Sequence, residues 1–431
     1  MSLPDHIDRP LEEWVTEQRW FASKAREVAS VNVLARVSLN AAPALELELV
    51  ETRFQSGTHE LYQLLPGEDD GVRALAAMLG SETTVDGVAF HGGLEPTGAI
   101  RAMGAEQSNS SIVFGEQQVL KVFRRVEPGI NPELEMLRFL SSRGFANIAT
   151  LTGWYDYSGE LMQATLGIMQ EFVGDARDGW ELALDDPREM LARIPALGAA
   201  TGEMHTVLAS DTMDPAFLPE EPSSEALSLL TATIDEQIEQ VFLDLPPDDE
   251  ALAPILGRGE EVRDRLQMMS HVGVGGRLIR HHGDYHLGQT MLKGAIRPDG
   301  GRDEPRWVIL DFEGEPARSL LERRRKRSPL RDVAGMLRSF AYAASASELL
   351  RGVPAPAGWE DDARRAFLEA YMETIEPSLL PAGRPATEKL LAIFELEKAV
   401  YELRYELNNR PDWVPIPVAG IARLLQEDHD D

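Results

Sequence analysis

One stretch, residues 280–316, constrains the chain more than any other. It reads Arg-His-His-Gly-Asp-Tyr-His-Leu-Gly-Gln-Thr-Met-Leu, then a polar insert, then Trp-Val-Ile-Leu-Asp-Phe-Glu-Gly-Glu-Pro. Asp284 follows a glycine on a polar loop, and the carboxamide of Gln289 comes five residues later. The apolar segment 307–310 predicts a short buried strand that ends at a second acid, Asp311. The pattern therefore predicts two polar clusters joined through one buried strand.

Phosphoryl transfer of the protein-kinase kind requires these residue types in this order. One carboxylate accepts the proton of the attacking hydroxyl group, while an amide oxygen and a second carboxylate hold Mg²⁺ over the phosphates. Asp284, Gln289 and Asp311 offer these three groups. The competing interpretation is a hairpin with a few solvated acids. The second cluster, at the right distance from the first, disfavours that interpretation.

Length and charge bound the class of protein. A chain of 431 residues is too long for one compact core and predicts two or three domains. It has 42 basic and 72 acidic residues, and its net charge of −30 disfavours binding to nucleic acid or to an anionic membrane. The basic run 323–327 is an exception. We interpret it as a brace for phosphates or neighbouring carboxylates rather than as a nucleic-acid patch.

Features that the sequence lacks narrow the possible classes of protein further. The chain has no cysteine, so it has neither disulfides nor thiolate metal sites. No stretch approaches the about 18 apolar residues of a membrane span, and no basic segment followed by an apolar run opens the sequence. We therefore expect a soluble, cytoplasmic protein.

The first segment predicts a small cap domain. An aromatic-rich stretch, 14–21, has a helical pattern, and the alternating runs 31–39 and 44–54 predict antiparallel strands. The segment has no cluster of catalytic residue types. We expect residues 1–92 to form an N-terminal cap subdomain, followed by a second subdomain over 93–175.

A hairpin in that second subdomain is a candidate nucleotide site. Its approach is rich in small polar residues, among them Ser108, Asn109 and Ser110, which can present N–H and hydroxyl groups to phosphate oxygens. The Gly-x-Gly-x-x-Gly pattern is missing, so a plain hairpin turn at Gly115 is an equally good interpretation. Lys121 lies among apolar neighbours in the second strand, where an ammonium group needs an acidic partner or a ligand.

The helix that follows offers that acidic partner. Asn131 is the expected N-cap and Pro132 the first helical residue. Glu135 is the first choice for the partner of Lys121, and Glu133 is the second. A strand lysine paired with a helix glutamate orients the α and β phosphates in kinases.

An apolar strand, 166–173, ends this subdomain. In a kinase with two lobes the hinge belongs here, and the backbone groups of Glu171 and Val173 would be offered to adenine. A buried edge strand explains the pattern equally well.

Beyond residue 176 we expect a mostly helical lobe that extends to residue 431. His205 lies on an amphipathic helix, and we interpret it as a satisfied core residue rather than a ligand. Ser328 and Pro329 predict the start of another helix, with Asp332 close behind. That acid either favours the helix dipole or reaches back to hold the backbone of the catalytic loop, and the sequence leaves both open.

The helix predicted over 391–409 has two distinct faces. One is an apolar, core-facing stripe: Leu396, Val400, Leu403 and Leu407. The opposite face gathers tyrosines among polar groups, namely Lys398, Tyr401, Glu402, Tyr405 and Asn409, and Trp413 follows the helix. Aromatic faces beside fixed donors and acceptors suit sugar hydroxyls, so we favour a sugar site over a polar helix face.

Blocks from about residue 100 to the C-terminus together resemble bacterial maltokinases. They are Glu106-Gln-Ser-Asn-Ser-Ser, Leu120-Lys-Val-Phe-Arg-Arg, Gly129-Ile-Asn-Pro-Glu, His282-Gly-Asp-Tyr-His-Leu-Gly-Gln, Asp311-Phe-Glu-Gly-Glu-Pro, Ser328-Pro-Leu-Arg-Asp-Val-Ala-Gly-Met-Leu-Arg-Ser-Phe and Tyr405-Glu-Leu-Asn-Asn-Arg-Pro-Asp-Trp. Gln18-Arg-Trp-Phe-Ala resembles the start of that family's cap. The His-Gly-Asp block is shared with aminoglycoside phosphotransferases and other eukaryotic-like kinases.

The resemblance implies ATP- and Mg²⁺-dependent phosphorylation of maltose to maltose 1-phosphate, which feeds α-glucan (glycogen) synthesis from trehalose. It implies an α+β, bilobal, protein-kinase-like fold with an extra N-terminal cap and a mostly helical C-terminal lobe. A trehalose synthase is a plausible partner.

Site roles carry over residue by residue. Asp284 would be the catalytic base, Gln289 and Asp311 the Mg²⁺ ligands, and Lys121 with Glu135 the residues that orient the phosphates. The residues expected to contact the sugar are His286, Glu313, Lys398, Tyr401, Glu402, Tyr405 and Trp413.

Other functions share this scaffold. Glucosamine kinases differ from maltokinases in the sugar pocket, and the sequence alone does not separate the two. An aminoglycoside-type phosphotransferase would show fewer aromatics on the last helix, and a pseudokinase would lack some of the catalytic residues. One departure from the family pattern is Thr290, where many maltokinases have valine, which leaves the packing of the metal site open.

Overall fold

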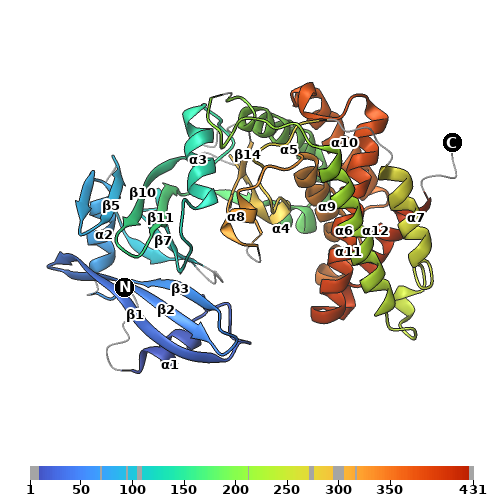
Figure 1. Cartoon of the computed structure of the whole chain (residues 1–431). Helices are drawn as coiled ribbons and strands as arrows, with labels where there is room; N and C mark the ends of the chain where they lie inside the picture. Colours follow the sequence, from blue (N-terminus) through green and yellow to red (C-terminus); the bar gives the residue numbers. More distant parts are fainter. Residues whose placement is uncertain are drawn as a thin grey trace. The chain divides into compact units, whose positions relative to one another are not determined.

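The structure is a computed structural model, and it describes residues 9–67, 70–93, 96–103, 109–211, 213–270, 276–294, 305–315 and 318–426. The chain divides into two compact units, residues 1–175 and 176–431. The first is rich in strands and the second in helices (Figure 1). Across the described residues, no helix is both long enough and apolar enough to cross a membrane.

In its described residues, the first unit contains two antiparallel sheets and three helices. The smaller sheet has the strand order β1 (Val28–Ala41), β2 (Ala44–Phe54), β3 (His59–Leu64), β9 (Arg125–Val126). The larger has the order β4 (Thr83–Val85), β5 (Val88–Gly92), β10 (Leu151–Ser158), β11 (Gln163–Glu171), β8 (Gln118–Phe123), β7 (Asn109–Phe114), β6 (Ile100–Ala102). The helices are α1 (Leu11–Glu17), α2 (Gly71–Leu79) and α3 (Pro132–Ser142).

The expected strands of the cap are confirmed, and the expected helix is shorter than predicted. Helix α1 ends at Glu17 because Gln18 is extended, and its side chain donates to the Trp14 carbonyl instead. Trp20 and Phe21 therefore lie beyond the helix. Both pack on the buried ring of Tyr62, with ring centroids 5.4 and 5.5 Å away. Burial of the aromatic cluster, rather than helical periodicity, explains the pattern of this stretch.

The hairpin β7–β8 and helix α3 confirm the sequence interpretation. Gly115 and Glu116 both have left-handed backbone, with φ of 56° and 54°, which matches the twist of a tight antiparallel hairpin. Asn131 caps α3 and accepts a hydrogen bond from the Glu133 N–H at 2.8 Å, with Pro132 at the first helical position.

The second unit combines a small antiparallel sheet with helices. The strand order is β12 (Ala176–Asp178), β13 (Thr290–Lys293), β14 (Arg306–Ile309). The α-helices are α4 (Gly179–Asp185), α5 (Pro187–Leu208), α6 (Ser224–Leu243), α7 (Gly259–Ser270), α8 (Leu320–Arg323), α9 (Leu330–Arg351), α10 (Trp359–Thr374), α11 (Arg384–Asn409) and α12 (Pro415–Gln426). Short 3₁₀ turns are η1 (Glu250–Leu252), η2 (Leu287–Gln289), η3 (Pro377–Leu379) and η4 (Pro411–Trp413).

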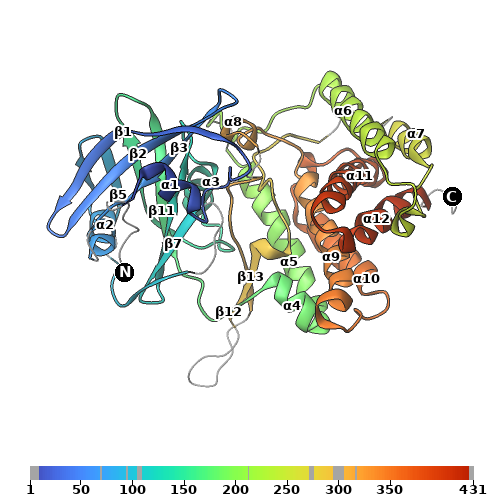
Figure 2. The ribbon, with the colours of Figure 1, turned by 90° about the horizontal axis from the view of Figure 1, so that it is seen from below.

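Helices α6, α7, α11 and α12 share one apolar core (Figure 2). The predicted stripe on α11 is confirmed, because Leu396, Val400 and Leu403 are buried there and Leu407 packs against the cluster. Helix α11 begins earlier than expected, at Arg384. The buried strand expected before Asp311 is β14, whose last three residues are buried.

Candidate active site

The Asp284 loop is tied to the end of strand β14. His282 Nε2 lies 2.8 Å from the carbonyl oxygen of Leu310, so this nitrogen carries the proton and donates. His282 Nδ1 is then free to accept the backbone N–H of Asp284, at 3.4 Å. The imidazole packs between Tyr285 and Phe312, with ring centroids 5.1 and 4.9 Å away. One side chain thus links the loop to the residue before Asp311.

Asp332 of α9 also holds the Asp284 loop, through hydrogen bonds to the backbone of the loop. Its carboxylate accepts hydrogen bonds from the N–H groups of His282 at 2.7 Å and Gly283 at 2.9 Å. It also lies 3.0 Å from His205 Nε2, and His205 Nδ1 contacts the Tyr371 hydroxyl at 3.0 Å. Of the two interpretations of Asp332, holding the loop is therefore confirmed. His205 is confirmed as a satisfied core residue.

The charge of Asp332 is stabilised by its surroundings. Burial alone would raise the pKa of this carboxyl group, but His281 and the hydrogen-bonded His205 hold the pKa below its ordinary value. The carboxylate therefore stays ionised and keeps both loop N–H groups bound.

Gly335 allows α9 to approach the loop closely. A Cβ atom at this position would lie 2.6 Å from the carbonyl oxygen of Tyr285. The Tyr285 side chain points inward and is buried, with its hydroxyl 2.8 Å from Thr201 Oγ1. The loop backbone is thus held between Asp332, Gly335 and Thr201.

We expect Gly335→Ala to displace the loop and to lower both activity and stability. The added methyl group would meet a backbone oxygen that cannot rotate away, and overpacking of this kind costs about 1–3 kcal/mol. Thermal unfolding and steady-state turnover measure the effect. The control is Gly93→Ala, because a Cβ atom there meets nothing within 4 Å. Equal turnover in both variants would contradict the close-approach argument.

Asp311, Gln289 and Glu313 form an oxygen-rich group. Gln289 Nε2 lies 3.2 Å from Asp311 Oδ2, and carboxylate oxygens of Asp311 and Glu313 lie within 4.8 Å of each other. Asp311 has left-handed backbone, with φ of 61°, a conformation that is uncommon outside glycine and concentrates at functional sites. Carboxylates and a carboxamide oxygen are hard ligands that suit Mg²⁺, so these residues fit the expected metal.

Thr290, the departure from the family pattern, is satisfied locally. Its buried hydroxyl group donates to the carbonyl oxygen of Leu287 at 2.7 Å. The hydroxyl therefore stabilises the turn that carries Gln289.

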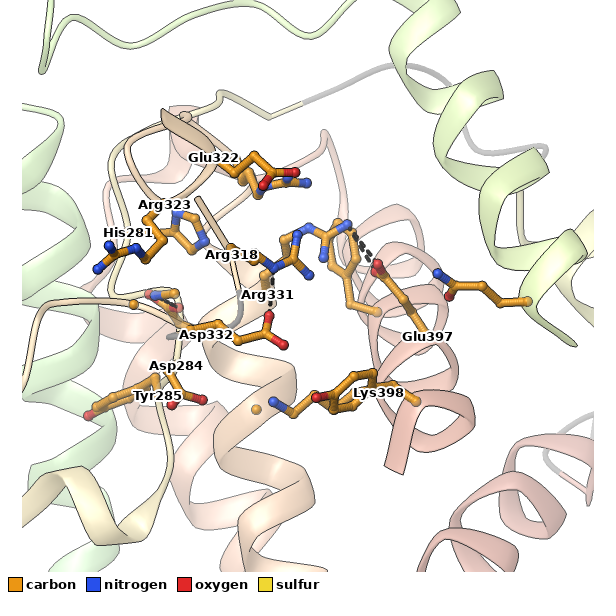
Figure 3. Close-up of a pocket in the computed structure, with 18 residues that line it drawn as sticks. His281, Asp284, Tyr285, Arg318, Glu322, Arg323, Arg331, Asp332, Glu397 and Lys398 are labelled. Atoms are coloured by element: carbon orange, nitrogen blue, oxygen red, sulfur yellow. Dashed lines mark hydrogen bonds and ion pairs between the residues drawn. The ribbon is translucent and has the colours of Figure 1, made fainter. Parts of the chain in front are cut away.

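Beside Asp284 lies a cavity of about 130 Å³ within the second unit. Figure 3 shows Asp284 and Tyr285 on one side of it and Lys398 on α11 across from them. Its remaining lining residues are mostly charged: Gln237, His281, Gly283, Gly314, Glu315, Arg318, Glu322, Arg323, Arg327, Arg331, Asp332, Gly335, Phe394, Glu397 and Tyr401. Burial and the neighbouring Glu315 carboxylate raise the pKa of Tyr401, which keeps its hydroxyl protonated.

The predicted sugar residues on α11 and after it divide into two groups. Lys398 and Tyr401 line the cavity with Asp284. Glu402 is buried instead and pairs with Arg338 at 2.8 Å. Tyr405 is exposed, and Trp413 stacks on Tyr342. In the described part of the chain, Glu402, Tyr405 and Trp413 are not among the cavity's lining residues.

The two other expected sugar contacts lie on the loops themselves. His286 is half-buried, and its Nδ1 accepts the N–H of Gly288 at 3.1 Å. Burial lowers the pKa of His286, with His282 and Lys398 adding to the effect, although Asp284 opposes it. Glu313 lies 4.0 Å from Arg323. Neither is among the lining residues of the cavity that the structure describes.

In the first unit, Lys121 makes the ion pair that a strand lysine needs. Its Nζ lies 2.7 Å from Glu133 Oε2, and both side chains are largely buried. The acid in this pair is the one that the sequence ranked second. Glu135 is half-buried on the same helix, and its role toward phosphates stays a prediction.

The residues expected to bind phosphate and adenine differ in the partners that their polar groups already have. Ser108 lies outside the described residues. Asn109 begins β7, and the Ser110 hydroxyl accepts Arg124 Nε at 2.8 Å. The Glu171 N–H donates to the carbonyl oxygen of Thr150 at 2.8 Å, and the role of Glu171 toward adenine stays a prediction. Among the described residues, the Val173 N–H has no backbone acceptor.

Two features of the cavity could not be predicted from the sequence. Arg331 and Glu397 line the cavity as an ion pair with a separation of 2.9 Å, although their helices are far apart in the chain. The sequence predicts the cationic residues before α9 only as a brace for phosphates or neighbouring carboxylates, without a place in the cavity. Their place beside Asp284 depends on long-range packing.

The chain is similar in sequence to one domain family and to two glucosamine kinases. Residues 14–88 match the maltokinase N-terminal cap domain. The glucosamine kinase of Streptacidiphilus jiangxiensis is 27% identical over 384 residues, which cover 84% of this chain and 82% of the relative. The glucosamine kinase of Mycolicibacterium smegmatis is 26% identical over 340 residues, 76% of this chain and 80% of the relative.

A solved structure supports the fold. A glucosamine kinase in complex with glucosamine, ADP and inorganic phosphate has a TM-score of 0.72 and 21% identity, covering 96% of this chain and 99% of that one. The expected fold class is thereby confirmed, with its cap and its mostly helical C-terminal region. Residues 14–88 are thus similar to the maltokinase N-terminal cap domain, and the chain as a whole is similar to glucosamine kinases, with whose structure it shares its fold.

Proposed function

We propose that the protein is an ATP-dependent sugar kinase, and that its acceptor is maltose, which it converts to maltose 1-phosphate. The observation that carries the proposal is the cavity beside Asp284, which Lys398 and Tyr401 also line. A carboxylate, an ammonium group and an aromatic hydroxyl in one small cavity suit the many hydroxyl groups of a sugar. The cap domain, found in maltokinases, supports the same choice.

Asp284 would accept the proton of the attacking sugar hydroxyl group. Its carboxylate is half-buried, and the loop that carries it is held by hydrogen bonds on both sides. Such positioning is what a general base contributes. Mg²⁺, held by Asp311, Gln289 and Glu313, would neutralise charge on the phosphates when bound. Rotation of the Gln289 amide would present its oxygen to that ion.

Lys121 would orient the phosphates of ATP, because Glu133 fixes its ammonium group. We expect Lys121→Met to lower kcat/KM for ATP by about a hundredfold or more, the effect typical of removing one phosphate clamp. Glu133→Gln should act in the same direction but less strongly. The exposed Lys24→Met is the matched control. Steady-state kinetics with varied ATP measure the effect, and an unchanged value for Lys121→Met would remove this role.

The positive charge of Lys398 favours a neutral sugar beside it. Two of its acids are already paired, Glu315 with Arg318 at 2.5 Å and Glu397 with Arg331 at 2.9 Å. The Lys398 ammonium group adds a positive charge. A protonated amine that lay beside Lys398 would meet like charge. Maltose has no amine and avoids that cost.

Glucosamine phosphorylation to glucosamine 6-phosphate is the second candidate, because both curated relatives described above are glucosamine kinases. The product of the maltose reaction would feed α-glucan synthesis from trehalose. A trehalose synthase partner and a cytoplasmic location both stay predictions.

A sugar panel separates the two candidates. The full chain is supplied with Mg-ATP and with maltose, glucosamine, glucose or an aminoglycoside, and ADP release is followed. We expect the highest kcat/KM with maltose. A higher value with glucosamine would replace maltose by the second candidate, and release without any sugar dependence would reject both.

A further inference from the structure

Arg327 is a cation that the cavity leaves without an acidic partner. Its neighbours along the cavity wall are paired, Arg318 with Glu315 and Arg331 with Glu397. Within the part of the chain that the structure describes, Arg327 makes no side-chain hydrogen bond or ion pair, and yet it lines the cavity. An anionic ligand would offset the desolvation of this unpaired guanidinium group, which is half removed from water.

The position of Arg327 is well defined. Its backbone exchanges two hydrogen bonds with Ile279, each 2.9 Å long, just before the Asp284 loop. Burial and the charges of Arg331 and Arg318 together lower the pKa of Arg327 to about 10, against an opposing effect of the Glu397 carboxylate. The group is therefore still charged at neutral pH. It lies among like charges, which an anion would relieve.

His281 supplies a second, independent observation. Its side chain lines the same cavity and is only 9% exposed. Its Nδ1 is buried without a hydrogen-bond partner among the described residues. A buried polar nitrogen left in this way costs free energy unless a ligand or water satisfies it. Burial lowers the pKa of His281 to about 3, so the ring is neutral and can exchange one hydrogen bond with a ligand.

We propose that this cavity contains an oxyanion subsite, in which Arg327 binds a phosphate group and His281 Nδ1 completes its hydrogen bonding. Arg318 and Arg331 flank the subsite and add positive charge. Guanidinium groups match the oxygens of phosphate in geometry, and a protonated phosphate oxygen suits a neutral imidazole. Figure 3 shows Arg318, Arg331 and His281 around the cavity that also holds Asp284, and Arg327 lines the same cavity.

This site would make phosphate a competitor of the sugar, because Arg327 and Asp284 line one cavity. Only that kinetic consequence rests on the proposed sugar-kinase function. Binding of phosphate to the subsite does not depend on that function. The phosphate group could arrive as free inorganic phosphate or as part of a phosphorylated sugar, and both share the chemistry that Arg327 recognises.

The test is calorimetric titration of the full chain with inorganic phosphate, in saturating Mg-ADP so that the nucleotide site is filled. We expect saturable binding that becomes about tenfold to a hundredfold weaker in Arg327→Met, as expected for loss of a hydrogen bond to a charged group. Arg327→Lys should bind with intermediate affinity. Arg325→Met, an exposed arginine two residues away, should bind like the wild type. Thermal unfolding checks that each variant is folded.

A second arm compares glucose 1-phosphate with inorganic phosphate. Tighter binding of the sugar phosphate, lost in Arg327→Met, assigns the subsite to a phosphorylated sugar. Equal binding, also lost in that variant, assigns it to the free anion. The proposal is overturned if phosphate does not bind beside Mg-ADP, or if Arg327→Met binds as tightly as Arg325→Met. In the turnover assay, phosphate should raise the KM for the sugar in the wild type and not in Arg327→Met.

Discussion

Asp284→Asn is expected to lower phosphoryl transfer to the sugar by about a hundredfold to ten-thousandfold, the range typical of losing a general base. Asparagine has nearly the same shape but cannot accept the proton of the attacking hydroxyl group. The loop that carries residue 284 is held by His282 and Asp332 rather than by the Asp284 side chain. Folding and ADP binding should therefore be unchanged.

Single-turnover transfer of labelled phosphate measures the effect, and calorimetry with ADP measures nucleotide binding. The matched control is Asp264→Asn, an exposed acid of the same unit on α7. Turnover by Asp284→Asn at the rate of Asp264→Asn would show that another group accepts the proton.

Asp332→Ala should have the largest effect on stability. The change removes the acceptor of two loop N–H groups and of His205, in a site where the acid is only 2% exposed. Removing one member of a buried charged network costs about 3–5 kcal/mol. The Asp284 loop would also lose its support from α9, so turnover should fall even in molecules that remain folded.

Asp361→Ala is the matched control for this variant. Asp361 lies in the first turn of α10, as Asp332 lies in the first turn of α9, but it is exposed. Its interaction with the helix dipole is worth at most about 1 kcal/mol. Thermal unfolding of both variants separates the two roles. If Asp332→Ala is no less stable than Asp361→Ala, the carboxylate contributes only through the dipole and the loop is held by other contacts.

The local features of the site could be predicted from the sequence. The apolar strand before Asp311, the cap at Asn131 and the apolar stripe at Leu396 each depend on residues that are close in the chain. Strand pairing, helix capping and helical periodicity are short-range effects, so the pattern alone identifies them.

The choice between neighbouring acids could not be predicted. Glu133 and Glu135 are two positions apart on one helix, and both are compatible with a partner in strand β8. Which acid faces Lys121 depends on how the helix is rotated against the sheet. The buried position of Glu133 beneath its cap decides it.

The sequence also could not predict which polar residues of α11 are buried and which line the cavity. Glu402 shares a face with Lys398 and Tyr401 by helical spacing, but α9 brings the buried Arg338 against it. Arg327 and His281 were not recognised as parts of the cavity for the same reason. Long-range packing decides which polar residues of a helix face a cavity and which are enclosed.

The central claim is that the cavity beside Asp284 positions a sugar hydroxyl group for transfer of phosphate from ATP. It is tested most directly by ³¹P NMR of the full chain incubated with Mg-ATP and maltose. We predict a new phosphate monoester resonance coupled to the anomeric proton of the sugar, absent in Asp284→Asn. Release of inorganic phosphate alone, or no monoester with any sugar, would contradict the claim.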